Sequence, residues 1–407
     1  MSENGARPAI RFTGFTDAWE RRKLDELASF SKGYGYTKSD LMESGTPIIH
    51  YGRLYTKYET VISGIDTFAH AKVSSIYSRG DEVIVPASGE TAEDISRASV
   101  VEIAGVLLGG DLNIVYPNDE IDSIFLALSI SNGNQQKEMA KRAQGKSVVH
   151  LHNADLKEVM LSYPEKAEQR EIGVFFCRLD HLITLHQRKY DKLVNIKKAM
   201  LEKMFPQNGA SVPEIRFAGF ADVWERRELG EVVDSYIDPV PTPHDGYTRL
   251  GIRSHAKGTF HNYVMPGNEL ETAQMHRVGE DNFIVNITFA WEHAVAVTNK
   301  EDAGKLVSHR FPQFRFKERM IPEYFKYLIL DERFRYHLWL SSPGGAGRNR
   351  VLKIEAMLEY SFWVPSADEQ SRIAVFLNNL DHIIALQQRK LQKLRNFKMA
   401  CLEKMFV

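Results

Sequence analysis

The sequence predicts an α+β protein made of two similar halves, each with one domain of mixed α/β content and one long helix. Three observations support this prediction. A block that begins IRFTGF at Ile10 returns as IRFAGF at Ile215. A second block, ending in LEKMF, closes at Phe205 and again at Phe406, and the segments between the blocks hardly match. We therefore expect a pseudo-twofold internal repeat whose two middles have diverged.

The opening block is the first part of this signal. Residues 10–24 and 215–229 are identical at 11 of 15 positions, including a Trp, a Gly and two Phe. Such residues do not recur by chance in this order. The repeat therefore determines the domain organisation within which each motif is interpreted.

The closing block predicts a long helix in each half. Pro164 and Pro365 stand at its start, where proline suits the first helical position, and Ser366 with Glu369 forms a possible capping box. Apolar residues then recur in steps of three and four, which gives each helix one apolar stripe. The stripes are Phe175, Leu179, Leu182, Tyr190, Leu193, Ile196, Met200 and Met204, and Phe376, Leu380, Ile383, Leu391, Leu394, Phe397, Cys401 and Met405.

About forty residues of helix span roughly 60 Å. Neither stripe can be buried by its own helix, so we expect the two helices to pack as an antiparallel coiled coil. His186 and Gln387 interrupt the stripes at one equivalent place. Each fits either a residue that reaches solvent or one that fixes the register of the helix pair.

The middles contain short β-rich runs such as TPIIHY, DEVIVP and GVLLGGDLNIVYP, separated by Gly, Pro and Asp. These runs predict strands and turns. A helical stretch follows at Ser123 in the first half, and another runs from Pro322 through Leu340 in the second. Both middles therefore have one α+β ground plan.

Net charge, cysteine content and hydropathy limit the classes of protein to which this chain can belong. The 407 residues carry a net charge of −1, which disfavours an indiscriminate nucleic-acid binder, so any DNA contact must come from local basic loops. The two cysteines, Cys177 and Cys401, provide neither a disulfide framework nor a metal set, and we expect both to fill space on a helix. No signal-peptide start or membrane-spanning apolar run is present, so we expect a cytoplasmic protein without membrane contact.

Basic and hydrogen-bonding residues gather in particular loops, at matching places in both halves. Arg and Lys can pair with guanine, Asn and Gln with adenine, and glycine lets the backbone approach phosphate. For any single residue a solvated turn is the simpler interpretation, but the repeated pattern favours DNA binding. The candidates are Arg53, Tyr55, Lys57, Lys146, Ser147, His150, Arg249, Arg253, His255, Lys257, Arg348, Asn349 and Arg350.

Short matches to three ligand-binding motifs of enzymes occur in the sequence, and each is incomplete. GKS at Gly145 lacks the glycine five positions earlier that a nucleotide-binding loop needs, since Ala140 stands there. FTGF at Phe12 resembles the glycine turn of S-adenosylmethionine enzymes, but the further glycine and an Asn-Pro-Pro-Tyr motif are missing. His150 and His152 lack a suitably spaced third metal ligand. We therefore predict a chain that is not an enzyme and binds no cofactor or metal.

Taken together, the RF-x-GF…W-E-R-R opening and the P…EQ…LD…QRK…KL…LEKMF closing resemble a specificity subunit of a type I restriction–modification enzyme. The resemblance covers essentially the whole chain, and the segment YTRLGIRSHAKGTF also resembles a recurring pattern of that family. It implies two target recognition domains, each reading one half of a split DNA sequence. The two antiparallel helices would separate the domains, set the gap and dock methylation subunits.

On this resemblance we expect four segments, and these are a first target recognition domain (1–162), a first spacer helix (163–206), a linker with a second target recognition domain (207–362) and a second spacer helix (363–407). The expected partners are double-stranded DNA, two methylation subunits and two restriction subunits. S-adenosylmethionine and ATP with Mg²⁺ would bind to those subunits. The alternative is a non-enzymatic coiled-coil adaptor with two divergent protein-binding domains, which sequence-dependent DNA retardation would exclude.

Overall fold

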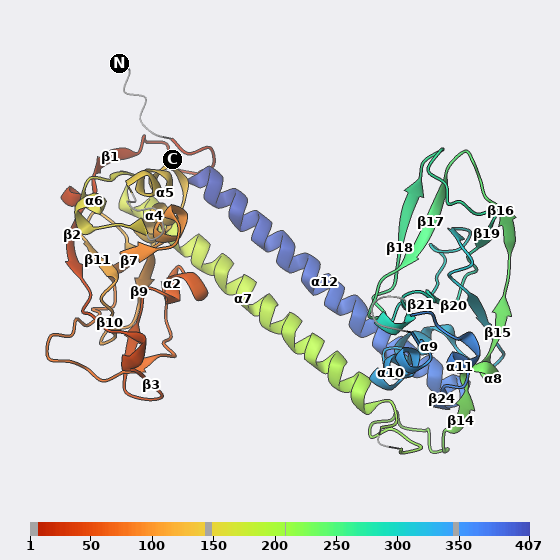
Figure 1. The fold of residues 1–407 in the computed structure, drawn as a ribbon. Coiled ribbons are helices and arrows are strands. Elements are labelled where there is room, and N and C mark those ends of the chain that lie inside the picture. Colours follow the sequence, from red (N-terminus) through yellow and green to blue (C-terminus); the bar gives the residue numbers. More distant parts are fainter. Residues whose placement is uncertain (1–6, 143–148, 208, 345–349) are drawn as a thin grey trace. The chain divides into compact units, whose positions relative to one another are not determined.

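The computed structural model describes residues 7–142, 149–207, 209–344 and 350–407. Its contacts divide the chain into two compact units (Figure 1). The first unit is Met1–Lys189 with Gln388–Val407, and the second unit is Tyr190–Gln387. Each long helix is therefore divided between the units, whereas the boundaries expected from the sequence kept each helix in one segment.

The first unit contains two small sheets and two two-stranded ladders. One sheet has the order β2 (Ala28–Lys32), β11 (Leu112–Pro117), β7 (Val83–Pro86), β9 (Ser99–Val101), β5 (Val61–Ile62). The other has the order β10 (Leu107–Leu108), β4 (Thr46–Ile49), β6 (Phe68–Ala69), β3 (Leu41–Met42). The ladders are β1 (Glu20–Lys23) with β13 (Met160–Tyr163), and β8 (Ser88–Gly89) with β12 (Val149–His150). The expected strands are confirmed.

Short helices complete the first unit, and they are α1 (Leu24–Leu27), α2 (Arg53–Thr56), η1 (Lys38–Asp40), α3 (Ala92–Ile95), α4 (Ser123–Ser131), α5 (Gly133–Arg142) and α6 (Asn153–Lys157). The helical stretch expected from Ser123 is thus two helices, because Asn132 ends α4 in an extended conformation. Asp122 caps α4 by accepting hydrogen bonds from two backbone N–H groups of its first turn.

The second unit repeats this plan with different strand lengths. Its sheets have the orders β15 (Val233–Tyr236), β23 (Gln313–Phe316), β20 (Asn282–Val285), β21 (Val295–Val297), and β16 (Pro239–Pro241), β19 (Gln274–Arg277), β22 (Leu306–Val307), β17 (Tyr247–Ile252), β18 (Thr259–Val264). A ladder joins β14 (Glu225–Glu228) to β24 (Ser361–Val364). The helices are α8 (Leu229–Val232), η2 (Ala290–Glu292), α9 (Pro322–Leu328), α10 (Glu332–Leu340) and α11 (Ile354–Leu358). The single helix expected from Pro322 to Leu340 is again broken, here at Asp331, which caps α10.

The two long helices are α7 (Lys166–Lys203) and α12 (Ala367–Met405), with 38 and 39 residues. Their length confirms the prediction from the apolar stripe. Their start does not match, because Pro164 and Pro365 lie two residues before the first helical residue. Ser366 Oγ accepts a hydrogen bond from the Glu369 N–H at 3.4 Å, which is half of the expected capping box.

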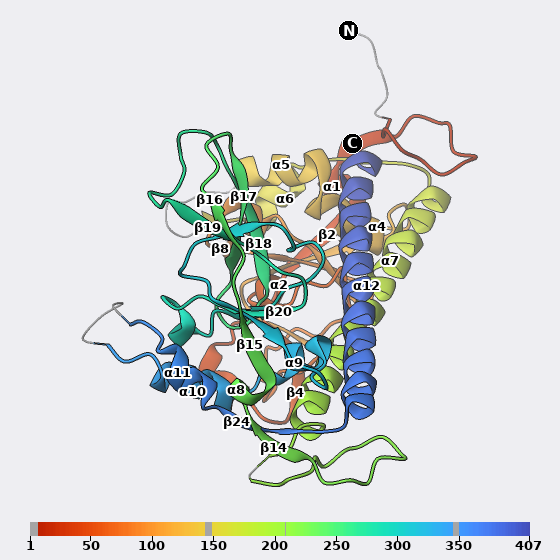
Figure 2. The same cartoon turned by 90° about the vertical axis from the view of Figure 1, so that its right-hand side faces the viewer.

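Within the first unit the two helices lie side by side and run antiparallel (Figure 2). Asp180 of α7 pairs with Lys398 of α12 at 2.5 Å, and Gln187, later in α7, accepts from Arg395, earlier in α12, at 2.9 Å. The second unit contains the equivalent ion pair, between Lys197 and Asp381, also at 2.5 Å. The aspartate of each Leu-Asp motif therefore holds the lysine of the adjacent helix.

The Glu369 side chain does not complete the capping box, because it binds the opening block instead. The equivalent glutamate of the first unit does the same. Glu369 turns its carboxylate to Arg216 of the opening block, at 2.8 and 2.7 Å, and Glu168 binds Arg11 in the same way, at 2.8 and 2.6 Å. Both glutamate side chains are almost fully buried, with 1% and 2% exposed. Hydrogen bonding to the carboxylate raises the pKa of each arginine. The buried pair fixes the opening block to the start of the long helix.

The glutamine that follows each of these glutamates connects the helix to the middle. Gln169 accepts from the backbone N–H of Asp122 and donates to the carbonyls of Glu120 and Pro164. Gln370 makes the same three bonds with Ile321, Arg319 and Pro365. Both amides are completely buried, so the Glu-Gln motif has a structural function.

The LEKMF endings complete the two cores. Phe406 packs against Phe125 and Phe176 of the first unit, with ring centroids 5.9 and 6.0 Å apart. Phe205 stacks on Tyr324 of the second unit at 5.4 Å. The last turn also binds the opening block, because the Ile10 N–H donates to the Lys404 carbonyl and the Ile215 N–H to the Lys203 carbonyl. Each core is thus closed by the end of a helix that begins in the other unit's sequence.

Candidate nucleic-acid interface

The β17–β18 hairpin of the second unit presents one group of the predicted residues. Its turn, residues 253–258, places His255 and Ala256 at φ of 62° and 49°, and Gly258 at 82°. Left-handed backbone of this kind is costly for residues other than glycine, so the surroundings have to fix it. The turn is fixed by N–H donation from His255 and Ala256 to the carbonyls of Glu292 and His293. Lys257 is exposed at its tip.

A buried carboxylate orients the second strand of this hairpin. Asp302, 1% exposed, accepts from Thr259 Oγ1 at 2.9 Å and from His261 Nε2 at 2.8 Å. Its other oxygen accepts from the backbone N–H of Asn299 at 3.0 Å. Because Asp302 occupies Nε2 of His261, the imidazole is held in one orientation at the surface of β18.

Arg253 is held by an aromatic ring. Its guanidinium lies 5.2 Å from the ring centroid of Phe260 and donates to the carbonyl of Thr259. Phe260 in turn lies over Gly251, where an added Cβ would stand 2.3 Å from the ring. A side chain at position 251 would therefore displace the Phe260 ring. Arg249 lies beside Asn262 in the same ladder, partly exposed.

Arg350 belongs to a second group in this unit. Its guanidinium lies 4.7 Å from the ring centroid of Trp339, and its Nη1 donates to the carbonyl of Ser342 at 3.4 Å. The chain next binds the segment before η2, since the Leu352 N–H donates to the Ile287 carbonyl at 2.9 Å. Residues 286–293 thus support both the hairpin turn and the segment that follows Arg350. Two regions about a hundred residues apart in sequence share one support.

In the first unit the predicted group on α2 is largely engaged in internal contacts. Arg53 pairs with Glu59 at 2.7 Å and with Asp66 at 2.8 Å, donates to the Gly64 carbonyl, and leaves 9% of its side chain exposed. Lys57 also pairs with Asp66, at 3.0 Å. Contact of Arg53 with DNA would require it to exchange these partners.

Tyr55 lines one large cavity of the first unit, and His150 pairs with a residue that also lines it. The cavity has a volume of about 1000 Å³ and is lined by Tyr51, Tyr55 and Ser88 among others. The Tyr55 hydroxyl donates to the Ser88 carbonyl, and β12 pairs His150 with the same serine. Four predicted residues, Lys146, Ser147, Arg348 and Asn349, lie outside the described residues.

Comparison with known proteins identifies the repeat. The profile of the type I restriction modification DNA specificity domain matches this chain twice, over residues 16–195 and 222–396. The chain belongs to this family. The specificity subunit of the type I restriction enzyme MjaVIII from Methanocaldococcus jannaschii is 19% identical over 396 residues, covering 93% of this chain and 90% of the relative. The S subunit from the type I restriction–modification system of M. genitalium has the same fold, with a TM-score of 0.59 at 12% identity over 99% of each chain.

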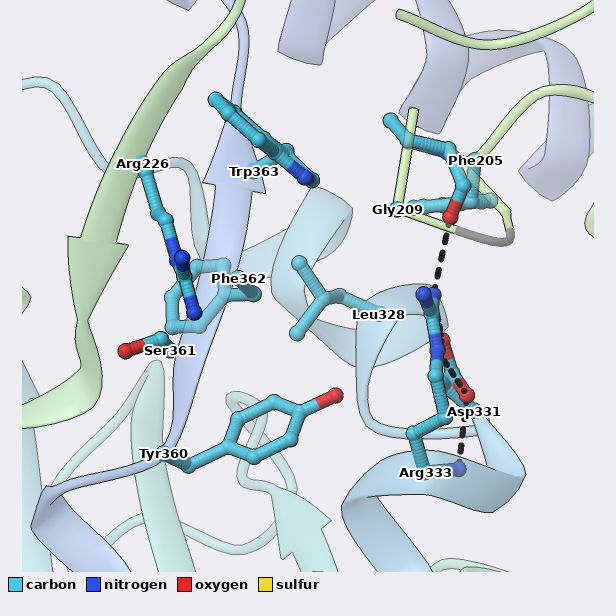
Figure 3. A pocket seen from close by; sticks show the side chains of 11 residues that line it. Phe205, Gly209, Arg226, Leu328, Asp331, Arg333, Tyr360, Ser361, Phe362 and Trp363 are labelled. Atoms are coloured by element: carbon cyan, nitrogen blue, oxygen red, sulfur yellow. Dashed lines mark hydrogen bonds and ion pairs between the residues drawn. The ribbon is translucent and has the colours of Figure 1, made fainter. Parts of the chain in front are cut away.

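The second unit of this specificity protein also has a cavity of about 240 Å³, whose described lining includes none of the predicted DNA-binding residues. It lies where shared blocks meet, and its lining includes Phe205, Arg226 and Trp363. Figure 3 shows Arg333 between Asp331 and the segment that follows Phe205. Arg333 donates to the Pro206 carbonyl at 2.9 Å. The cavity is thus part of the junction between α7 and the domain.

Sequence reasoning missed the aromatic partners of the arginines in this specificity protein. Phe260 and Trp339 hold Arg253 and Arg350, and Tyr336 stacks on Trp339. A signal existed in FRYHLWL, because burying Phe334 and Leu338 on one face of a helix leaves Tyr336 and Trp339 outside. Among the described residues no group of three or more His, Cys, Asp or Glu side chains could hold a metal ion. No helix in the same ranges is long and apolar enough to cross a membrane.

Proposed function

We propose that this chain is the DNA-recognition subunit of a type I restriction–modification complex and that each unit's divergent middle reads one half of a bipartite target. The observation that supports the proposal is that the two units share some residues and their contacts but differ in others. The Arg-Glu pair, the Glu-Gln motif and the LEKMF ending occur in both units with the same contacts. The candidate DNA-binding loops differ between the units, as two different half-sites require.

The proposed protein partners follow from the residues that the two units share. Shared surfaces suit equivalent partners, and we propose that the long helices dock two methylation subunits and that two restriction subunits complete the assembly. The methyl donor S-adenosylmethionine and ATP with Mg²⁺ would bind those subunits, and this chain would select the sequence without catalysing a step. A net charge of −1 is compatible with this role, since partners can supply much of the phosphate neutralisation.

Exchange of one middle tests the assignment. Replacing residues 233–360 with the corresponding middle of a relative is expected to change one half of the methylated sequence and preserve the other. These limits keep the β14–β24 ladder, in which Glu228 pairs with Ser361. The measurement is genome-wide mapping of methylated bases in cells that contain the chain and its methylation subunits. A change in both halves, or methylation with the original specificity, contradicts the proposal.

Helix length tests the role of α7 and α12 in setting the gap. Four residues add about 6 Å of helix, and DNA rises about 3.4 Å per base pair. Inserting four helical residues after Lys189 and four after Gln387 is therefore expected to lengthen the unread gap by one or two base pairs, with both half-sites unchanged. The insertions lie inside the helices because Met204 and Phe205 are buried in the second unit's core.

The control for this experiment is an insertion of two residues at each place. Four residues keep the apolar stripe nearly in phase, whereas two rotate it by about half a turn and should impair assembly. Methylated-site mapping of the four-residue variant decides the matter. Normal activity with an unchanged gap means that the helices do not set the spacing.

A further inference from the structure

We propose that Arg350 reads a guanine in the half-site of the second unit and that Trp339 is its positioning residue. The inference rests on the proposed function, because it names a base-reading group within one recognition domain. Neither residue belongs to the blocks shared by the two halves. Both residues are described by the structure, and both lie on the surface of the second unit.

The guanidinium of Arg350 is held without a carboxylate. Its Cζ lies 4.7 Å from the Trp339 ring centroid, and its Nη1 donates to the carbonyl of Ser342, a completely buried residue. Within the described ranges no acidic side chain lies within ion-pair distance of Arg350, in contrast to Arg53 with its two carboxylates. Its charge and its remaining N–H donors are therefore available to a ligand.

The support beneath Arg350 is rigid. Helix α10 buries Phe334 and Leu338 completely, which fixes the opposite face that carries Tyr336 and Trp339. The two outer rings stack at 5.9 Å with an interplanar angle of 12°. Tyr336 is 61% exposed and Trp339 41% exposed, so the platform is open to a large ligand. A ring fixed in this way sets the plane of the guanidinium that lies on it.

A fixed plane favours a base over a phosphate. Guanine presents O6 and N7 as two acceptors in the major groove, and the planar fork of arginine can bind both at once. A phosphate is an anion with several equivalent oxygens, and it can also be bound by the point charge of a lysine, so contact with it does not require a fixed plane. The stacked arrangement is therefore more than a phosphate contact needs.

The first unit has no copy of this platform at the equivalent positions, which lie among its described residues. Asp122 and Ile321 occupy equivalent places, since each donates its N–H to the glutamine of a long helix. Counted from them, the residues that match Tyr336 and Trp339 are Lys137 and Ala140. Phosphates are the same in both half-sites, but the bases differ. A device without a copy at the equivalent, described positions of the other unit fits base reading, and it does not fit an equivalent protein partner of both units.

The test measures base preference in the assembled complex of the full chain with its methylation subunits. Duplexes randomised in the second half-site are selected by gel shift and sequenced, for the wild type and for Arg350→Lys, Trp339→Ala and Trp339→Phe. We expect the wild type to require guanine at one position of that half-site. Arg350→Lys and Trp339→Ala should each lose this preference by roughly 5- to 150-fold, with other positions unchanged. Trp339→Phe, which keeps a ring, should retain most of it.

A matched control is Arg372→Lys, because Arg372 also lies over a ring, that of Phe217 at 5.8 Å, but within the shared blocks. It should leave every base preference unchanged. Unaltered preference in Arg350→Lys or Trp339→Ala overturns the inference, as does a wild-type half-site without a G·C pair. A further variant, Arg350→Ala, removes the charge; uniformly weaker binding with a flatter salt dependence in this variant would show a phosphate contact instead and overturn the inference. Absence of any sequence preference in the wild type would overturn the proposed function itself, which separates the two failures.

Discussion

Glu168→Ala is expected to lower the free energy of unfolding of the first unit by about 3–5 kcal/mol, the usual cost of removing one partner of a buried ion pair. Glu168 is 1% exposed and binds Arg11 through two hydrogen bonds, at 2.8 and 2.6 Å. Alanine leaves Arg11, whose side chain is 13% exposed, without its carboxylate partner. It also releases the opening block from the start of α7. Amide hydrogen exchange resolved along the chain measures the effect for each unit separately.

Two variants control this experiment. Glu158→Ala breaks a surface pair with Lys23 in which both side chains are about half exposed, and it should cost no more than about 1 kcal/mol. Glu369→Ala breaks the equivalent buried pair with Arg216 and should destabilise the second unit instead. A Glu168→Ala protein that resembles Glu158→Ala would show that the buried pair does not fix the opening block.

Phe406→Ala is expected to destabilise the first unit by about 3–5 kcal/mol, although it lies one residue from the end of the chain. The ring is 6% exposed and packs on Phe125 and Phe176. Its loss leaves a cavity in a core built mainly from residues before 180. Increased amide exchange should therefore appear in α4 and in the first half of α7.

Met399→Ala is the matched control on the same helix, because Met399 is 68% exposed. It should change the free energy of unfolding by less than about 0.5 kcal/mol. If Phe406→Ala increases exchange in the second unit, or matches Met399→Ala, then the end of α12 does not belong to the first core. Urea unfolding of both variants gives an independent estimate.

The repeat and the long helices could be predicted because their signals are local. Steps of three and four along the closing blocks place apolar side chains on one face, whatever surrounds the helix. The start of each helix was harder to predict. Ser366 and Glu369 fit a capping box, but the Glu369 carboxylate binds Arg216, more than 150 residues away, and spacing along the chain contains no trace of that partner.

The partners of the candidate DNA-binding residues could not be predicted from the sequence either. Arg53 and Arg350 are both arginines in basic segments of the sequence, so the sequence predicts DNA binding for both. The structure gives Arg53 two carboxylates and Arg350 an indole ring. A charged side chain that is already paired has to exchange its partners before it can contact DNA, and pairing depends on residues that the fold brings together.

The sequence alone determined that this protein is a tandem repeat, in which each half has a shared collar (its opening and closing blocks) and a middle of its own. Identity over residues 10–24 and 215–229 and apolar periodicity are properties of the chain itself. Tertiary structure decided what the collars do and how the middles present their side chains. Buried hydrogen bonds need geometry as well as residue type, since Glu168 and Gln169 are neighbours with different partners. Stacking of Arg350 on Trp339 likewise depends on the place where α10 ends, which only packing against the core fixes.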